Sequence, residues 1–286
     1  MTSNPPRACV MGHPVAHSRS PMIHGYWLKN LGIAGSYELQ DLSPEAFTGF
    51  VQSFAQNGFV GGNVTVPHKE AAFKLAQRRE PAAEAIGAVN TLWLEDGLLV
   101  GGNSDTHGFI AHLDHTAPGW QVKNGRAVVL GAGGSARSAV YGLAQRGFEV
   151  AIVNRTVDRA RELAAHFNPH FDNRISAHGH DALAELLPRA DLLVNCTSCG
   201  MDGKPKLEID LAQLKLSAVV YDVVYVPLET ELLVQAKARG HRTVDGLGML
   251  LEQAGYGFQK WFGASPEVTP ELRAIVEADS RAKTPK

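Results

Sequence analysis

The chain has 286 residues, more than most single domains contain, so its length favours two domains that share a cleft. Its composition, 44% hydrophobic and 20% charged, is typical of a globular enzyme and argues against disorder except at the ends. The 27 Lys and Arg residues against 29 Asp and Glu residues give a net charge of −2, which argues against nucleic-acid binding through excess positive charge.

The sequence also argues against a membrane protein. Its apolar stretches are shorter than the roughly 20 residues that cross a bilayer, and residues 1–6 lack a signal pattern. We therefore expect a cytoplasmic protein without membrane or metal partners. Cys196 and Cys199 have the spacing of a redox motif, but they end a strand-like run instead of opening a helix, and with Cys9 the three cysteines cannot all pair.

Residues 7–66 alternate strand-like runs (ACVMG, SYELQDL, GFVGGNVTV) with helical patterns, which predicts a mostly parallel sheet. One helix is expected to begin with Ser20 as its N-cap and Pro21 at its first position. A second is expected to begin at Ser43–Pro44. We interpret their apolar stripes as core: Ile23, Tyr26, Trp27 and Leu31 in the first helix, and Phe47, Phe50, Val51 and Phe54 in the second.

A β-hairpin is predicted between Ala88 and Asp105. Asp96 and Gly97 supply the turn chemistry between two apolar arms. Pairing of these arms brings Asn90 and Asp105 to the same open end. The polar stretch from about His115 to Gly125 then reads as a linker into a second domain.

From Arg126 the alternation restarts with AVVLGAGG, EVAIVNRT, DLLVNCT, AVVYDVVY and HRTVDG, and helices are expected up to about Arg146 and from about Asp158 to His166. The pattern predicts a Rossmann-type doubly wound sheet. The last 40 or so residues read as helices that pack back on the first domain, with an apolar stripe of Leu247, Leu250, Leu251, Ala254 and Phe258. The predicted fold is thus α/β with two domains: residues 1–110 with helices from about 250–286, and a Rossmann-type domain of residues 120–248.

A dinucleotide site is predicted where an apolar strand ends and a helix begins. The glycines allow a tight turn and close approach of the backbone to a diphosphate, and the helix N-terminus offers free N–H groups. The residues concerned are Gly131, Ala132, Gly133, Gly134, Ser135 and Ala136.

The residues after the second strand of this domain favour NADP over NAD. NAD enzymes usually place an acidic residue there for the ribose 2′-hydroxyl, whereas this chain has Asn154, Arg155 and Thr156. The Arg155 guanidinium can bind a 2′-phosphate, and Arg159 is a second candidate cation. The alternative is that both arginines only solvate the start of a helix.

Polar side chains of the first half follow strand ends, where ligands of parallel α/β sheets bind. Each also has a purely structural explanation: Ser20 as helix cap, Thr65 as strand residue, Asn90 as turn residue and Asp105 as helix cap. Hydroxyl and amide groups suit a polyhydroxy carboxylic acid. The set comprises Ser18, Ser20, Asn63, Thr65, Lys69, Asn90 and Asp105.

Lys69 is the candidate catalyst. It lies in the first turn of a predicted helix, where the helix dipole disfavours a cation. A lysine at this position therefore suggests a functional role. A lysine can accept the hydroxyl proton while hydride leaves a secondary alcohol, and Asp105 could orient its ammonium group. The competing proton carriers are His13, His17 and His24, which flank the loop and helix near the N-terminus.

Nine ordered motifs resemble the shikimate dehydrogenase family: GHPVAHSRSPMIH, NVTVPHK, GAVNT, GGNSDTHG, GAGGSARSA, NRT, NCTSCGM, YVPLETELL and DGLGMLLEQ. The resemblance implies reversible reduction of 3-dehydroshikimate to shikimate with NADPH, a step toward chorismate and the aromatic amino acids. It implies that Lys69 and Asp105 are the catalytic pair. It also implies carboxylate contacts from Ser18, Ser20 and Tyr225, hydroxyl contacts from Thr65, Asn90, Asp105 and Gln253, and nicotinamide contacts from Gly246 and Met249.

Two other functions stay open at this point. One is a quinate/shikimate dehydrogenase that uses NAD, although serine at both Ser18 and Ser20 fits shikimate better than quinate. The other is a catalytically silent nucleotide-binding sensor, against which the retained Lys69 and Asp105 argue. A homodimer is the oligomeric state that we consider.

Overall fold

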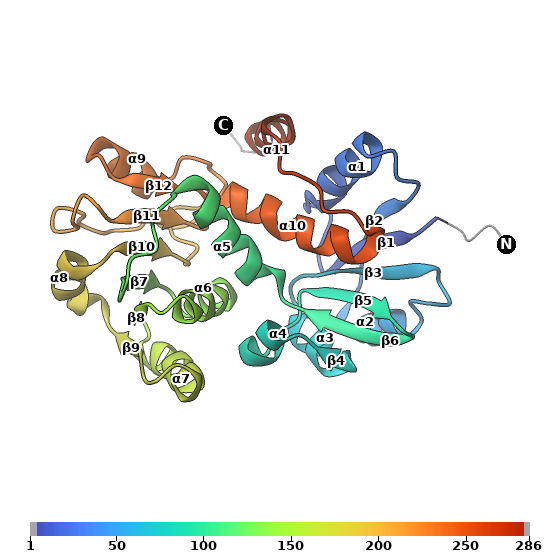
Figure 1. The fold of residues 1–286 in the computed structure, drawn as a ribbon, viewed down its shortest axis with the longest axis horizontal. Coiled ribbons are helices and arrows are strands. Elements are labelled where there is room, and N and C mark those ends of the chain that lie inside the picture. Colours follow the sequence, from blue (N-terminus) through green and yellow to red (C-terminus); the bar gives the residue numbers. More distant parts are fainter. Residues whose placement is uncertain (1–4, 283–286) are drawn as a thin grey trace. The chain divides into compact units, whose positions relative to one another are not determined.

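The computed structural model describes residues 5–282, which divide into two compact units (Figure 1). The first unit contains the chain up to Ser104 together with Leu251–Val276. The second contains Asp105–Leu250 and the described residues from Glu277 on. The expected domain boundaries stay a prediction, but the stretch from His115 to Gly125 is no linker, because the chain has already entered the second unit at Asp105.

The first unit is built on a six-stranded mixed sheet with the order β2-β1-β3-β5-β6-β4. Its strands are β1 (Arg7–Gly12), β2 (Ser36–Asp41), β3 (Phe59–Val64), β4 (Arg78–Arg79), β5 (Thr91–Glu95) and β6 (Leu98–Gly102). The first three pair in parallel as predicted, while β5 pairs antiparallel with both β3 and β6. The hairpin turn is confirmed: Asp96 and Gly97 have φ of 53° and 78°, the left-handed conformation that a tight two-residue turn requires.

Helices lie on both faces of this sheet. They are α1 (Ser20–Asn30), α2 (Pro44–Gln52), α3 (Lys69–Leu75) and α4 (Pro81–Ile86), joined by parts of α10 (Gly246–Phe262) and α11 (Pro270–Ala282). Phe47, Val51 and Phe54 are almost fully buried against one face, as predicted. In α1, however, the buried residues are Ile23, His24, Trp27 and Leu28, whereas Leu31 is 49% exposed because it follows the last helical turn.

The returning C-terminal segment covers the other face of the first sheet. Trp261 of α10 packs in a cluster with Val10, Tyr37 and Trp93, and its indole N–H donates to the Leu92 carbonyl at 2.8 Å. Gly61 makes room for it, since a Cβ there would lie 2.4 Å from the indole nitrogen. The prediction that the C-terminal helices pack on the first domain is therefore confirmed for Leu251–Val276.

The second unit is a parallel six-stranded sheet of order β12-β11-β10-β7-β8-β9, the doubly wound Rossmann arrangement. Its strands are β7 (Arg126–Leu130), β8 (Glu149–Val153), β9 (Ile175–His178), β10 (Leu192–Asn195), β11 (Val219–Asp222) and β12 (Arg242–Val244). Of these strands, β9 was not predicted from the sequence. The predicted α/β fold class with a Rossmann-type domain is confirmed.

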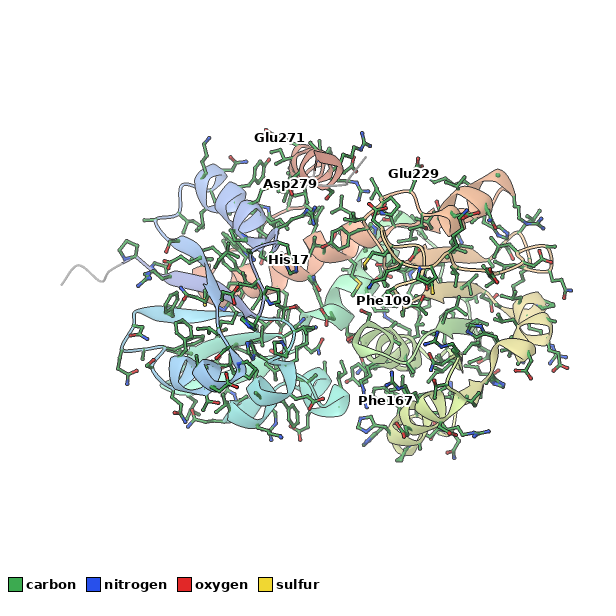
Figure 2. The ribbon with its side chains drawn as sticks, turned by 180° about the vertical axis from the view of Figure 1, so that it is seen from behind. His17, Phe109, Phe167, Glu229, Glu271 and Asp279 are labelled. Carbon is green, nitrogen blue, oxygen red and sulfur yellow. The ribbon has the colours of Figure 1, made fainter. Side chains whose placement is uncertain are left out.

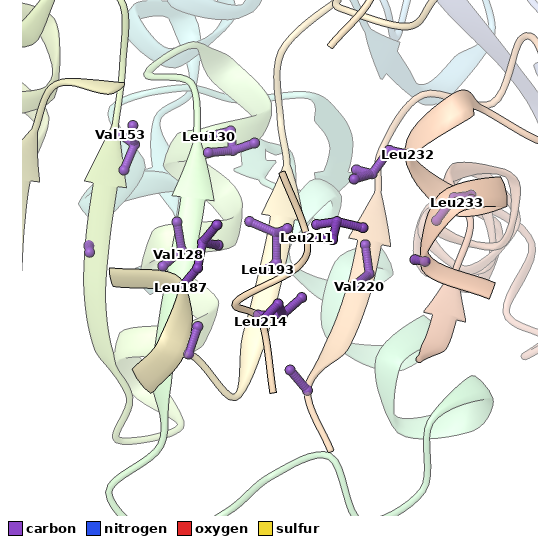
Figure 3. Packing of buried hydrophobic residues seen from close by; sticks show 14 residues of the cluster. Val128, Leu130, Val153, Leu187, Leu193, Leu211, Leu214, Val220, Leu232 and Leu233 are labelled. Atoms are coloured by element: carbon purple, nitrogen blue, oxygen red, sulfur yellow. The ribbon is translucent and has the colours of Figure 1, made fainter. Parts of the chain in front are cut away.

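Helices of the second unit flank this sheet. They are α5 (Ser104–Thr116), α6 (Gly134–Gln145), α7 (Val157–Phe167), α8 (Leu183–Leu186) and α9 (Glu231–Ala238), with 3-10 turns at Asn168–His170, His180–Ala182 and Leu187–Arg189. Figure 3 shows one face of the sheet, where leucines from α9 and from the loop before β11 cover valines of the central strands. The 14 buried residues of this cluster fix the strands whose carboxyl ends carry the predicted cofactor loops.

The opposite face of the second sheet is covered by α6, with α5 and α7 beside it. Phe109 and Phe167, labelled in Figure 2, come from α5 and α7. Phe109 stacks on Tyr221 of β11 at 4.8 Å, and Phe167 contacts Tyr141 of α6. Within residues 5–282, no helix is long and apolar enough to cross a membrane.

Candidate active site

Ser18 and Ser20 place two hydroxyl groups side by side at the start of α1. The Ser18 hydroxyl lies 3.2 Å from that of Ser20 and accepts the Ser20 backbone N–H at 3.3 Å. The prediction that Ser20 is the N-cap is wrong: Arg19 is the N-cap, and Ser20 is the first helical residue. Both side chains are half-buried, so they stay available to a ligand at a helix N-terminus, where an anion is favoured.

Asn63 lies near the carboxyl end of β3, and Thr65 is the first residue after the strand. The Asn63 carbonyl oxygen Oδ1 accepts a hydrogen bond from the Tyr37 hydroxyl at 2.6 Å, and its Nδ2 donates to the Asn90 carbonyl at 3.4 Å. The Thr65 backbone N–H donates to the Met11 carbonyl at 2.9 Å, which ties it to β1. The polar residues of this strand end are therefore held by their neighbours in the sheet.

Lys69 is the first residue of α3, as predicted, and its side chain is half-buried. Its carbonyl accepts the Val89 backbone N–H at 3.2 Å. The preceding His68 is buried, stacks on Phe47 at 4.3 Å and lies with Nε2 2.7 Å from the Leu42 carbonyl. The main chain at Lys69 is thus fixed from both sides.

Asn90 is buried and organises the open end of the hairpin. Its Oδ1 accepts hydrogen bonds from the Ser104 backbone N–H at 2.8 Å and from the Thr91 hydroxyl at 2.9 Å. Asp105 follows Ser104 directly in the chain and lies in the first turn of α5, where the helix dipole favours a carboxylate. Asn90 therefore fixes the backbone of Ser104, the last residue of the first unit before Asp105.

Gln253 lies in the part of α10 that belongs to the first unit. Its amide oxygen Oε1 is buried and has no hydrogen-bond partner within residues 5–282. A buried acceptor without a donor costs about 1 to 3 kcal/mol. That cost is recovered if a ligand hydroxyl donates to this oxygen.

His24 belongs to the core of the first unit. Its ring is fully buried and stacks on Tyr37 at 4.0 Å, with Phe258 and Trp261 also within 6 Å. Burial lowers the pKa of His24 to about 3, so the ring is neutral near pH 7. Among the competing histidines, this one is enclosed and ill placed to exchange a proton with a substrate.

The glycine turn of the second unit fits a dinucleotide diphosphate. Gly131 has a φ of +104°, which favours glycine, and its N–H donates to the Val153 carbonyl at 2.8 Å. A Cβ added at Gly133 or Gly134 would meet no atom within 4 Å, so the backbone at the start of α6 faces open space. Ala136 is fully buried, which agrees with a small residue at the helix–sheet contact.

The two exposed arginines that we predicted for a 2′-phosphate lie after β8, Arg155 in the turn and Arg159 in the first turn of α7. Asn154 turns the chain there, since its side chain donates to the Thr156 carbonyl at 2.8 Å. Arg155 and Arg159 both lie on the surface next to this turn. No acidic residue stands between β8 and Asp158, so nothing in this stretch opposes a phosphate.

Gly246 and Met249 open α10 within the second unit. A Cβ at Gly246 would lie 2.2 Å from the Val223 carbonyl oxygen, so only glycine fits where α10 crosses the segment after β11. Met249 is 8% exposed, and Tyr225 on that same segment is half-buried. No group of His, Cys, Asp or Glu side chains in the described part of the chain is arranged to hold a metal ion.

The three cysteines are free thiols. Burial raises the pKa of Cys196, which disfavours the thiolate that redox chemistry requires. The spacing between Cys196 and Cys199 thus reflects the loop after β10, not a dithiol site.

A buried polar network that was not predicted from the sequence joins the carboxyl ends of β10 and β11. Asp222 and Asn195 are both 0% exposed, and Asn195 Nδ2 donates to the Asp222 carboxylate at 2.9 Å. Its only signal in the sequence is a polar residue in each of two apolar runs, DLLVNCT and AVVYDVVY. These two residues are register partners in the sheet.

Comparisons with known proteins cover both units. The family model for the shikimate dehydrogenase substrate binding domain matches residues 10–92, and that for shikimate/quinate 5-dehydrogenase matches residues 114–202. A shikimate dehydrogenase (NADP(+)) of Mesorhizobium japonicum is 58% identical over 96% of each chain.

Solved structures agree with this similarity. Shikimate 5-dehydrogenase from Thermus thermophilus, in complex with NADP(H) and shikimate, is 35% identical with a TM-score of 0.83, over 96% of this chain and 99% of that one. Quinate dehydrogenase from Corynebacterium glutamicum, in complex with NAD, is 29% identical with a TM-score of 0.88, over the same shares.

Proposed function

Because the chain belongs to the shikimate dehydrogenase family, we propose that it catalyses the NADP-dependent, reversible reduction of 3-dehydroshikimate to shikimate, a step of chorismate and aromatic amino-acid biosynthesis. It is an oxidoreductase that acts on a CH–OH group. The observation that carries this function is the full-length similarity to NADP-dependent shikimate dehydrogenases, because it spans both units. The open glycine turn followed by Arg155 supports it independently.

The first unit supplies most of the proposed substrate contacts. The paired hydroxyls of Ser18 and Ser20, with Tyr225, bind the carboxylate. Thr65, Asn90, Asp105 and Gln253 bind the ring hydroxyls. Gln253 Oε1 supports this role, because it has no hydrogen-bond partner among residues 5–282 and can accept a hydrogen bond from a hydroxyl without losing another. A site built to hydrogen-bond hydroxyls discriminates strongly against analogues that lack them.

Lys69 is the proposed general acid and base, with Asp105 as its partner. The chemistry that NADP would supply at this site is hydride transfer, to the substrate carbonyl carbon in the reduction and from the alcohol carbon in the oxidation. In the reduction, the Lys69 ammonium gives a proton to the oxygen on which negative charge develops; in the oxidation, its amine takes the hydroxyl proton. Asp105 orients the ammonium group by charge and hydrogen bonding.

The second unit supplies the proposed cofactor contacts. Backbone N–H groups of the turn from Gly131 to Ala136 bind the diphosphate, and Asn154, Arg155, Thr156 and Arg159 surround the adenosine 2′-phosphate. Gly246 and Met249 border the nicotinamide. The proposed division of labour is thus a substrate domain of residues 1–110 with helices from about 250–286, and an NADP domain of residues 120–248.

A quinate/shikimate dehydrogenase that uses NAD is the second candidate function, and the similarity to the quinate dehydrogenase of Corynebacterium glutamicum favours testing it. Arg155, in place of an acidic residue, speaks for NADP. A silent nucleotide-binding sensor fits less well, because Lys69 and Asp105 are both retained. A cytoplasmic location and a homodimer remain predictions.

Absorbance at 340 nm tests this function directly. Purified protein with shikimate and NADP⁺ should form NADPH, and much less should form when quinate or NAD⁺ is substituted at equal concentration. Faster turnover of quinate with NAD⁺ would favour the second candidate. No turnover with either acid and either nucleotide would refute both enzyme functions.

A further inference from the structure

The loop after β10 and the segment after β11 border the proposed cofactor site from two sides. A Cβ added at Gly131 would lie 3.2 Å from the Cys196 carbonyl oxygen and 3.2 Å from Thr197 Cγ2, so the loop after β10 lies against the glycine turn. The segment after β11 lies against Gly246 through the Val223 carbonyl. Neither segment is held by regular secondary structure at these points.

One buried carboxylate joins these two segments. Asp222 Oδ1 accepts hydrogen bonds from Asn195 Nδ2 at 2.9 Å and from the Val224 backbone N–H at 3.0 Å. Its Oδ2 accepts a hydrogen bond from the Thr230 hydroxyl at 2.7 Å. Each oxygen therefore has at least one donor, and the donors come from the last residue of β10, the segment after β11 and the N-cap of α9.

Asn195, which is held by Asp222, also makes hydrogen bonds to the loop after β10. Its Oδ1 accepts from the Thr197 backbone N–H at 3.0 Å and from the Thr197 hydroxyl at 2.7 Å, while its Nδ2 also donates to the Cys199 carbonyl at 3.1 Å. The Thr197 hydroxyl oxygen in turn accepts the Cys199 N–H at 3.1 Å. The loop from Asn195 to Cys199 is thus closed by side-chain hydrogen bonds that begin at Asp222.

We propose that Asp222 is a positioning residue for the nicotinamide half of NADP, acting through Asn195 and Thr197 on one side and Val224 on the other. A fully buried carboxylate is costly in the interior of a protein, and a hydrophobic residue would fill the same space more cheaply. Its retention in an otherwise apolar strand is explained if several loop donors need one acceptor that can serve them together. The inference rests on the proposed binding of NADP at the glycine turn.

Adenosine 2′,5′-bisphosphate separates this role from general damage, because it carries the 2′-phosphate and adenine but no nicotinamide. In the intact chain, Asp222→Ala should weaken NADP⁺ binding about tenfold, the loss expected for one to two hydrogen bonds. Binding of the bisphosphate should change by less than about twofold. Asp222→Asn keeps an acceptor for Asn195, and the Thr230 hydroxyl can rotate to accept from the new amide, so its NADP⁺ affinity should stay close to that of the unmodified chain.

Asn168→Ala is the matched structural control. Asn168 also closes a loop of the second unit with two side-chain hydrogen bonds, to the Ile175 backbone, but that loop lies before β9, at the opposite end of the strands from the glycine turn. This variant should melt at a lower temperature and still bind NADP⁺ normally. Calorimetric titrations below each variant's melting temperature measure both ligands.

Equal weakening of both ligands in Asp222→Ala, or no weakening of either, would overturn the inference. If Asp222→Ala does not fold, Thr197→Val removes the hydroxyl from the loop without disturbing the carboxylate, and unchanged NADP⁺ affinity in that variant would also overturn it. Failure of the proposed function gives a different pattern, since the unmodified chain would then bind NADP⁺ without oxidising shikimate, or would not bind it.

Discussion

The stability of the chain should depend on pH through Asp222. Burial raises the pKa of this carboxyl from 3.8 to about 6, although hydrogen bonds from Thr230, Val224 and Asn195 act in the opposite direction. The folded chain therefore holds a proton here that the unfolded chain releases between these two values. The contribution to stability is fully present below pH 3.8 and is lost as pH rises to about 6.

The size of this effect follows from the shift. About two pKa units at about 1.4 kcal/mol each correspond to ~3 kcal/mol, of which roughly 2 kcal/mol falls between about pH 4.5 and 7. Asp222→Asn cannot ionise. The free energy of unfolding of this variant, minus that of the unmodified chain, should therefore increase by roughly 2 kcal/mol as pH rises from about 4.5 to 7.

Urea unfolding of both chains at several pH values measures this difference. All other titrating groups are shared by the two chains, so their contributions cancel in the subtraction. A difference that stays flat across the range would show that Asp222 is already ionised in the folded chain at the low end. A difference that falls with pH would also contradict a raised folded pKa, and either result would refute the argument.

The other predictions concern catalysis, cofactor choice and packing. Lys69→Ala should bind shikimate nearly normally but turn over slower by a factor on the order of 100 or more in steady-state and binding measurements, and normal turnover would remove Lys69 from the chemistry. Arg155→Ala should raise the Michaelis constant for NADP⁺ by about tenfold while leaving that for NAD⁺ almost unchanged; an equal rise in both would argue against contact with the 2′-phosphate. Phe47→Ala, at a fully buried position, should lower the free energy of unfolding by about 3 to 5 kcal/mol in urea titrations, whereas Leu31→Ala, at an exposed one, should change it by less than about 0.5 kcal/mol, and similar losses would contradict the burial pattern.

The main elements of the fold could be predicted because their signals are local. Most of the Rossmann strands are apolar runs that end at glycine or polar turns. The hairpin contains Asp96–Gly97 between two apolar arms, a pair that is typical of two-residue hairpin turns. The edge strand Ile175–His178 was missed because it has only one neighbour in the sheet and only Ile175 is buried. An edge strand of this kind therefore lacks most of the apolar residues by which a central strand can be predicted from the sequence.

The site residues could be predicted less completely. Helix starts show why: Ser18 and Ser20 are both suitable caps by sequence, but Arg19 has a helical backbone conformation, with φ of −89° and ψ of −5°, so the helix begins one residue earlier than expected. Asp222 shows a second reason. Its partner Asn195 lies 27 residues away, and only the register of two parallel strands brings the two side chains together.

The first unit is made of two segments that are far apart in the sequence, and this affects how the chain folds as it is synthesised. Its sheet is complete once the ribosome has passed Ser104, yet Trp261, which covers Leu92 and Gly61, is made more than a hundred residues later. Until then, the part of that sheet which Trp261 covers, including Trp93 and Val10, stays exposed and favours aggregation or chaperone binding. A premature stop codon before Leu251 would therefore remove part of the core of the first unit, although most of that unit is encoded near the N-terminus.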